Sequence, residues 1–236
     1  MIFPVDESGT AFYLHHLFRD FLNKELVETF SKSEIYRLHC TIAGKMEEED
    51  VFCALHHFIE GHDYDEAIRL IDTHEIHFLL EGKIIFLEEC INRIPKNIIE
   101  KNPQLLLAQA KLFTYFGNPR SATILLTRAH KLFKKQESRE NMIKCLVELG
   151  SLYYFTGYVK EAKLLMEQVL DDVEKPSMTY IIAMTYLTFL SSVLGEFETA
   201  ATYYKEVWEV IETLPDFKRK ASTVLINTSY SHTLYI

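Results

Sequence analysis

The sequence predicts an all-α protein, a right-handed superhelix built by stacking antiparallel helix pairs. Glycine and proline are scarce, with 8 and 6 among 236 residues, whereas an all-β fold or a disordered chain needs many of them. Three segments also repeat the same small and apolar residues at the same offsets. Their turn glycines, Gly117, Gly157 and Gly195, lie 40 and 38 residues apart. Repeats of this length are typical of helix pairs that cover each other's apolar faces.

The spacing within each repeat indicates which residue does what. A glycine that ends the first helix can take a positive φ in a tight turn. An alanine five residues later opens the contact face of the second helix, and larger apolar residues follow four and seven positions on. A small residue inside the first helix lets two helices approach closely. These structural positions are Gly117, Ala122, Gly150, Gly157, Ala162, Gly195 and Ala200.

Composition narrows the possible functions. The formal net charge is −9, so the chain is a poor partner for phosphate backbones and we expect no DNA binding by this segment itself. The four cysteines form no C-x-x-C pair, which predicts reduced thiols and a cytoplasmic protein. Cys40 and Cys53 lie among apolar neighbours and are expected to be buried. No apolar stretch reaches the roughly 18 residues of a membrane span, so we expect no membrane partner.

The repeats resemble the tetratricopeptide repeat (TPR), whose usual length is about 34 residues. The units here are longer, and the proline that normally ends a unit falls late, at Pro176 and Pro215. Longer helices explain both differences, so the units are described as TPR-like. A degenerate copy lies upstream, where the segment 58–71 carries the turn, Tyr64 and Ala67 in the same order.

The first third of the chain adds a second resemblance. Phe12 to Leu26 reads FYLHHLFRDFLNKEL, and further motifs follow it in a fixed order. This order is similar to that of the MalT-like large ATP-dependent LuxR-family transcriptional regulators. The residues that carry the resemblance are Phe12, His15, Leu17, Phe18, Arg19, Phe21, Leu22, His39, Asp63, Tyr64, Ala67, Gly82, Ile94, Pro95, Pro103 and Leu105.

The resemblance implies a central segment of such a regulator, divided into three parts. Residues 1–30 would end a winged-helix-like element. Residues 31–98 would form a helical linker with one degenerate helix pair, and residues 99–236 the TPR-like repeats, the last of them truncated. Residues 221–236 read as the first helix of a further unit, so we expect more repeats beyond Ile236.

The resemblance also implies partners. The segment would sense a small-molecule inducer, or a protein or peptide, and could self-associate. ATP is expected only in a preceding domain, because neither Gly44-Lys45 nor Gly82-Lys83 completes a phosphate-binding loop. DNA is expected only through a following domain. The alternative is a stand-alone TPR-like scaffold that joins proteins and has no link to transcription.

The candidate binding residues lie where first helices of TPR-like units face the concave surface. They are Gln104, Lys111, Thr114, Lys144, Ser151, Tyr154, Thr185 and Phe189. Rings, amides, hydroxyls and ammonium groups together suit a peptide or a small polar ligand such as a sugar. An unoccupied scaffold surface explains the same pattern equally well.

No catalytic or metal site is expected. His74 and His77 share a helix face, but no H-E-x-x-H motif or Cys/His quartet with zinc spacing occurs. No nucleophile lies in a signature such as G-x-S-x-G. The sequence therefore predicts a binding protein rather than an enzyme.

Overall fold

The computed structural model describes residues 2–4, 12–215, 219, 222–223 and 226. The chain folds into two compact units, Met1–Ile94 and Pro95–Ile236. The boundary after Ile94 falls close to the sequence-predicted start of the repeats at residue 99. The predicted division into residues 1–30, 31–98 and 99–236 stays a prediction.

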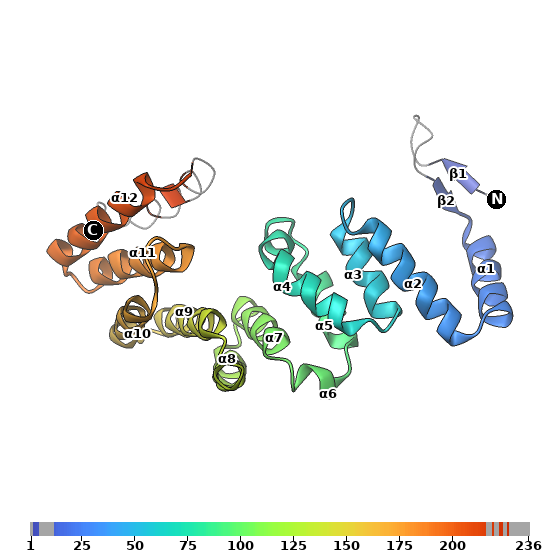
Figure 1. The fold of residues 1–236 in the computed structure, drawn as a ribbon, viewed down its shortest axis with the longest axis horizontal. Helices are drawn as coiled ribbons and strands as arrows, with labels where there is room; N and C mark the ends of the chain where they lie inside the picture. Colours follow the sequence, from blue (N-terminus) through green and yellow to red (C-terminus); the bar gives the residue numbers. More distant parts are fainter. Residues whose placement is uncertain (1, 5–11, 216–218, 220–221, 224–225, 227–236) are drawn as a thin grey trace. The chain divides into compact units, whose positions relative to one another are not determined.

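The first unit begins with a small antiparallel hairpin and continues as helices (Figure 1). Strands β1 (Ile2–Pro4) and β2 (Phe12–Leu14) pair with Ile2 opposite Leu14. The helices are α1 (His16–Thr29), α2 (Lys32–Met46), α3 (Val51–Glu60), α4 (Tyr64–Leu80) and α5 (Ile84–Arg93). Helix α3 packs against both α2 and α4, and its buried apolar residues form the middle of this unit.

Side-chain caps fix two of these helix starts. Ser31 and Glu34 form a capping box at the start of α2, which satisfies backbone donors that a helix leaves free. Asp50 Oδ1 accepts from the backbone N–H groups of Phe52 and Cys53, both at 3.0 Å, at the start of α3. The start of α2 and the start of α3 are therefore each determined by polar residues close by in the sequence.

The turn between α3 and α4 differs from the expected glycine turn. Gly61 has φ −77°, and His62 instead takes the left-handed conformation, with φ +57°. Gly61 serves close packing, because a Cβ there would lie 2.5 Å from Cys40 Sγ on α2. The glycine thus lets α2 approach the end of α3.

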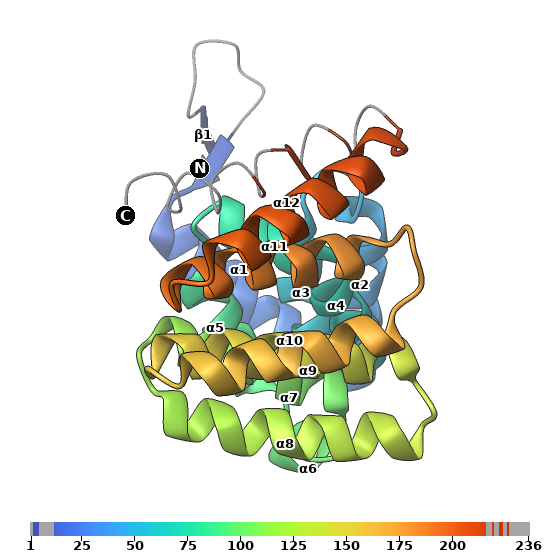
Figure 2. The same ribbon diagram turned by 90° about the vertical axis from the view of Figure 1, so that its left-hand side faces the viewer.

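The second unit is a stack of three helix pairs after a short helix α6 (Lys96–Ile99). The pairs are α7 (Pro103–Tyr115) with α8 (Pro119–Lys135), α9 (Arg139–Phe155) with α10 (Val159–Asp172), and α11 (Met178–Val193) with α12 (Phe197–Glu212). Figure 2 shows the second helices α8, α10 and α12 one above another. The turn glycines have φ values of +74°, +88° and +77° at Gly117, Gly157 and Gly195.

The core of this unit lies between successive helices. Ala122, Ala162 and Ala200 are fully buried at the start of each second helix. Gly150 on α9 faces Met166 on α10, where an added Cβ would lie 2.1 Å from Met166 Cε. Small residues at these positions let each pair close tightly.

The predicted all-α stack of TPR-like helix pairs is confirmed, while the right-handedness of the superhelix stays a prediction. Most of the helix expected over residues 221–236 lies outside the described residues. None of the described helices is long and apolar enough to cross a membrane.

The cysteines correct one expectation. All four are free, and Cys90 and Cys145 are buried. The prediction that Cys40 and Cys53 are buried is wrong, because both are partly exposed. Cys40 lies where α2 approaches the end of α3, with its thiol 3.7 Å from the Gly61 carbonyl oxygen, and that contact covers the side chain only in part.

Candidate functional site

The first helices of the three pairs form a layer of their own. Helix α7 contacts α9, and α9 contacts α11, whereas no comparable contact joins α8 to α10 or α10 to α12 within the described residues. In a curved stack the helices of the inner layer lie closer together than those of the outer layer. The layer α7–α9–α11 is therefore the inner side of this unit, where the sequence placed its candidate residues.

An ion pair links the first two helices of this layer. Lys111 Nζ on α7 lies 3.3 Å from Glu148 Oε1 on α9, and both side chains are less than one-third exposed. Glu148 was not among the sequence candidates. It lies one turn after Lys144 on the same helix, a spacing that could have indicated it.

A hydroxyl pair links the next two helices. Tyr186 Oη on α11 donates to Ser151 Oγ on α9 at 3.1 Å. Burial raises the pKa of Tyr186 and outweighs the lowering by the hydrogen bond to Ser151, and the nearby Glu148 carboxylate adds a smaller raising effect. Tyr186 therefore stays neutral at physiological pH. It too was missed, although it lies one turn before Phe189.

Two aromatic rings complete the contact between α9 and α11. The rings of Tyr154 and Phe189 meet edge to face with centroids 5.0 Å apart. Tyr154 also lies beside Phe155, at 5.3 Å. The structure thus brings Ser151, Tyr154 and Phe189 together between α9 and α11, as a half-buried ring pair next to a hydroxyl pair in which Ser151 is buried.

The other sequence candidates are not part of this cluster. Thr114 and Thr185 donate their hydroxyls to the carbonyls of Ala110 and Ile181, four residues earlier on their own helices. Thr185 is also buried, so it offers little to a ligand. Gln104 lies partly exposed on α7.

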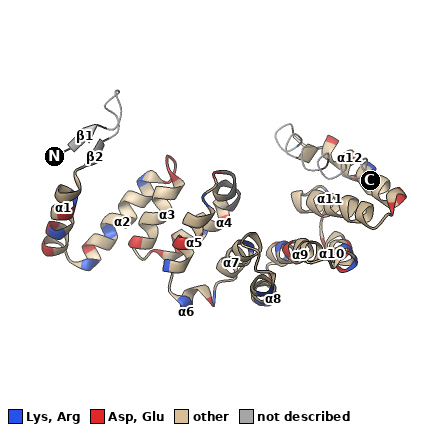
Figure 3. Cartoon of the chain, turned by 180° about the vertical axis from the view of Figure 1, so that it is seen from behind, with Lys and Arg blue, Asp and Glu red and all other residues tan. Residues whose placement is uncertain are grey.

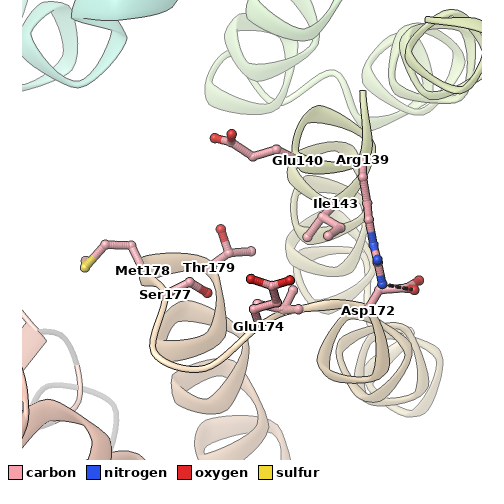
Figure 4. A pocket seen from close by; sticks show the side chains of 9 residues that line it. Arg139, Glu140, Ile143, Asp172, Glu174, Ser177, Met178 and Thr179 are labelled. Atoms are coloured by element: carbon pink, nitrogen blue, oxygen red, sulfur yellow. Dashed lines mark hydrogen bonds and ion pairs between the residues drawn. The ribbon is translucent and has the colours of Figure 1, made fainter. Parts of the chain in front are cut away.

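A cavity of about 380 Å³ opens at the other end of α9. Figure 4 shows it between the start of α9, the end of α10 and the start of α11. Its lining residues are Arg139, Glu140, Ile143, Asp172, Val173, Glu174, Ser177, Met178 and Thr179.

Charge in the cavity is uneven. Arg139, the one cation among the lining residues, donates to Asp172 Oδ1 at 3.1 Å, so the lining itself holds more carboxylates than cations. Glu140 also lies 3.1 Å from Lys144 Nζ, so this predicted residue borders the cavity rather than the ring pair. The cavity was not predicted, because it forms only when three separate helix ends meet.

The described residues hold no group of three or more His, Cys, Asp or Glu side chains able to bind a metal ion. The side chain of His77, one of the two histidines considered above, lies outside the described part. Figure 3 shows acidic and basic residues spread along the helices.

Comparison with known proteins gives one consistent relationship. Over 201 residues the chain is 22% identical to the HTH-type transcriptional regulator MalT of Vibrio campbellii, covering 85% of this chain. MalT of Serratia proteamaculans is 28% identical over 137 residues, or 58% of this chain. This chain resembles MalT-type regulators. The MalT-like chain spans about a fifth of their length, 21% for the Vibrio protein and 15% for the Serratia protein.

No family model matches the MalT-like chain. Among solved structures, that of the MamA protein superposes with a TM-score of 0.56 at 16% identity, covering 76% of this chain and 93% of MamA. At this identity the likeness concerns the fold alone, and it agrees with the stack of helix pairs described above.

Proposed function

We propose that this chain is the effector-sensing and protein-interaction segment of a signal-responsive transcription regulator, and that it performs no catalysis by itself. The match to MalT over 201 residues is the observation that carries the proposal. In this reading ATP binding and promoter binding belong to other parts of the regulator.

The inner layer supports a binding role. Tyr154 and Phe189 form an apolar platform, and the hydroxyls of Ser151 and Tyr186 lie on the same helices. A few polar groups beside an aromatic surface are typical of sites for peptides and small polar molecules such as sugars. Lys144 also lies on α9, at the border of the cavity, and its ammonium group would be available to a polar or anionic part of the ligand.

Calorimetric titration of the 236-residue chain against a panel of oligosaccharides and short peptides tests this assignment. We expect one class to bind, with Tyr154→Ala and Lys144→Ala each lowering its affinity about tenfold or more. Ile124→Ala is the matched control, since Ile124 is an exposed apolar residue on the outer helix α8. Unchanged affinity in both inner-layer variants would reject the inner layer as the binding surface.

A reporter assay separates the two readings of the chain. In the regulator reading, Tyr154→Ala introduced into the intact gene product lowers inducer-dependent transcription from its promoter. In the scaffold reading, the same change leaves transcription unaffected and weakens only the capture of a protein partner.

A further inference from the structure

Helix α8 gathers positive charge in a chain that is acidic as a whole. It contains five Lys and Arg residues and no Asp or Glu. The formal net charge of the chain is −9, so the residues outside α8, which contributes +5, together carry −14. The five side chains are called the basic face of α8 below, and they are Arg120, Arg128, Lys131, Lys134 and Lys135.

These side chains share one side of the helix. Residues three or four apart in a helix lie on the same side, and Arg128 and Lys134 are each three residues from Lys131. Lys135 follows one turn after Lys131, and Arg120 precedes it by three turns. All five are exposed, on the side opposite the buried residues of α8. The basic face is about 22 Å long from Arg120 to Lys135.

The chain itself neutralises little of this charge. Arg128 Nη2 lies 3.9 Å from Glu100 Oε2 and donates to the Glu100 carbonyl oxygen at 2.8 Å. The other four basic side chains form no ion pair with any residue that the structure describes. Most of the basic face is therefore available to a partner.

The stability of α8 does not account for its charge. Cations favour the last turn of a helix, where Lys134 and Lys135 lie, but they are unfavourable in the first turn, where Arg120 lies. Like charges three and four residues apart also repel one another. An anionic partner would relieve this repulsion.

The neighbouring outer helices limit the width of such a partner. Helix α10, next to α8 in the outer layer (Figure 2), has two lysines and four acidic residues, and α12 has one lysine and four glutamates. A DNA duplex or an anionic membrane extends beyond one helix, since the major groove of the duplex alone admits a whole helix. Either would meet the carboxylates of α10 while it contacts α8, which opposes association. One acidic segment of polypeptide is narrow enough to contact α8 alone.

We propose that the basic face of α8 docks a short acidic segment of another protein. Carboxylates of the segment accept charge-assisted hydrogen bonds from the ammonium and guanidinium groups. An extended segment of about seven residues spans the basic face, because each residue covers about 3.3 Å. The inference goes beyond the proposed function and does not rest on it, since α8 holds none of the inner-layer residues.

Fluorescence anisotropy of a labelled oligoglutamate peptide of about ten residues, titrated with the 236-residue chain, tests the proposal. We expect saturable binding that weakens as salt rises. Lys131→Glu combined with Lys134→Glu should raise the dissociation constant about tenfold or more, because carboxylates then face the peptide. Lys131→Gln combined with Lys134→Gln, which adds no acidic charge to the helix end, should raise it about threefold or more.

Lys160→Glu combined with Lys205→Glu is the matched control. Both lysines are exposed, on α10 and α12, and the double variant changes the net charge by the same amount. It should leave the dissociation constant within about threefold. Tyr154→Ala should leave it unchanged, which separates α8 from the inner layer. Absence of peptide binding, or an equal loss in the two charge-reversal variants, would overturn the proposal.

A second comparison separates an acidic protein segment from other polyanions. Binding of a short labelled DNA duplex, and co-sedimentation with vesicles of phosphatidylcholine and phosphatidylserine, are measured at the same salt concentration. We expect both to bind about tenfold or more weakly than the peptide. Tighter binding of the duplex or of the vesicles would overturn the assignment of a protein partner. Circular dichroism verifies that each variant folds.

Discussion

The imidazole rings of His39 on α2 and His57 on α3 face each other, with their Nδ1 atoms 2.8 Å apart. At this distance one Nδ1 must carry a proton and donate, and the other must accept. If both rings were charged, two donors would face each other. The contact therefore stabilises the α2–α3 pair only while at least one ring is neutral.

The surroundings favour neutral rings. Burial lowers the pKa of His39, and the neighbouring His56 lowers it further. The pKa of His57 is lowered by burial first and then by His39 and His56. On α5, Arg93 adds positive charge beside His56, and it also pairs with Glu60.

These shifts predict that the chain is less stable in mild acid. The folded-state pKa values lie below the unfolded value of about 6.5, so the unfolded chain binds more protons once the pH falls through 6.5. The free energy of unfolding measured at pH 7.5 should therefore decrease progressively once the pH falls below about 6.5. Urea midpoints measured between pH 7.5 and 5.5 report the loss.

Substitution identifies the source of this pH dependence. His57→Gln keeps a hydrogen-bonding side chain that cannot be protonated, so its midpoint should vary less with pH. His130, on α8, also has a pKa lowered by burial and by Lys134, and the remaining dependence should come partly from it. An unchanged slope in His57→Gln would show that the histidine pair is not responsible.

Substitution by alanine should change the stability of the chain in opposite directions at Gly150 and at Gly44. At Gly150 the new methyl group would overlap Met166 Cε, so Gly150→Ala should destabilise the chain by about 1–3 kcal/mol, and Gly150→Leu should prevent folding. Gly44 lies inside α2 with open space around it. Gly44→Ala should therefore stabilise the chain by about 0.5–1 kcal/mol.

Chemical denaturation of the two variants measures these effects. Adding Met166→Ala to Gly150→Ala removes the overlapping atoms. The double variant should therefore lose less free energy of unfolding than the sum of the losses in the two single variants. Additive costs would mean that the two side chains do not compete for the same space.

Two neighbouring serines on α11 should also respond differently. Ser192 Oγ donates to the Thr188 carbonyl at 2.8 Å, whereas Ser191 Oγ is buried and is the one described side-chain atom of its kind without a hydrogen-bond partner. An unpaired buried hydroxyl costs free energy. Ser191→Ala should thus leave the midpoint unchanged or raise it, and Ser192→Ala should lower stability by about 1 kcal/mol. A larger loss for Ser191→Ala would contradict this assignment.

The buried thiols should be unreactive. Burial raises the pKa of Cys90 and of Cys145 to about 12 in each case, and only the thiolate reacts with alkylating agents. Iodoacetamide at pH 8 should leave both unmodified in the folded chain and label them in urea, as read by mass spectrometry. The partly exposed Cys40 and Cys53 serve as internal references, and labelling of Cys145 at their rate would contradict the burial.

Much of the fold follows from short stretches of sequence. The turn glycines were identified because the left-handed backbone at Gly117, Gly157 and Gly195 strongly favours a residue without a Cβ. The start of α7 likewise follows from neighbouring residues, since Asn102 caps the helix and Pro103 stands in its first turn, and both act within one helical turn. Local rules of this kind need no knowledge of the neighbouring helices.

Only the tertiary structure decided which side chains meet. The pairs Lys111–Glu148, Ser151–Tyr186 and His39–His57 each join different helices, and their contact depends on how far each helix is rotated about its axis. Packing also decided what Gly61 does. The sequence pattern indicates a turn residue there, whereas in the structure Gly61 is the position where Cys40 on α2 comes close. Rotation and register result from packing the whole core, so repeat spacing identifies the helix pairs, whereas the partners across them emerge only when the helices are packed.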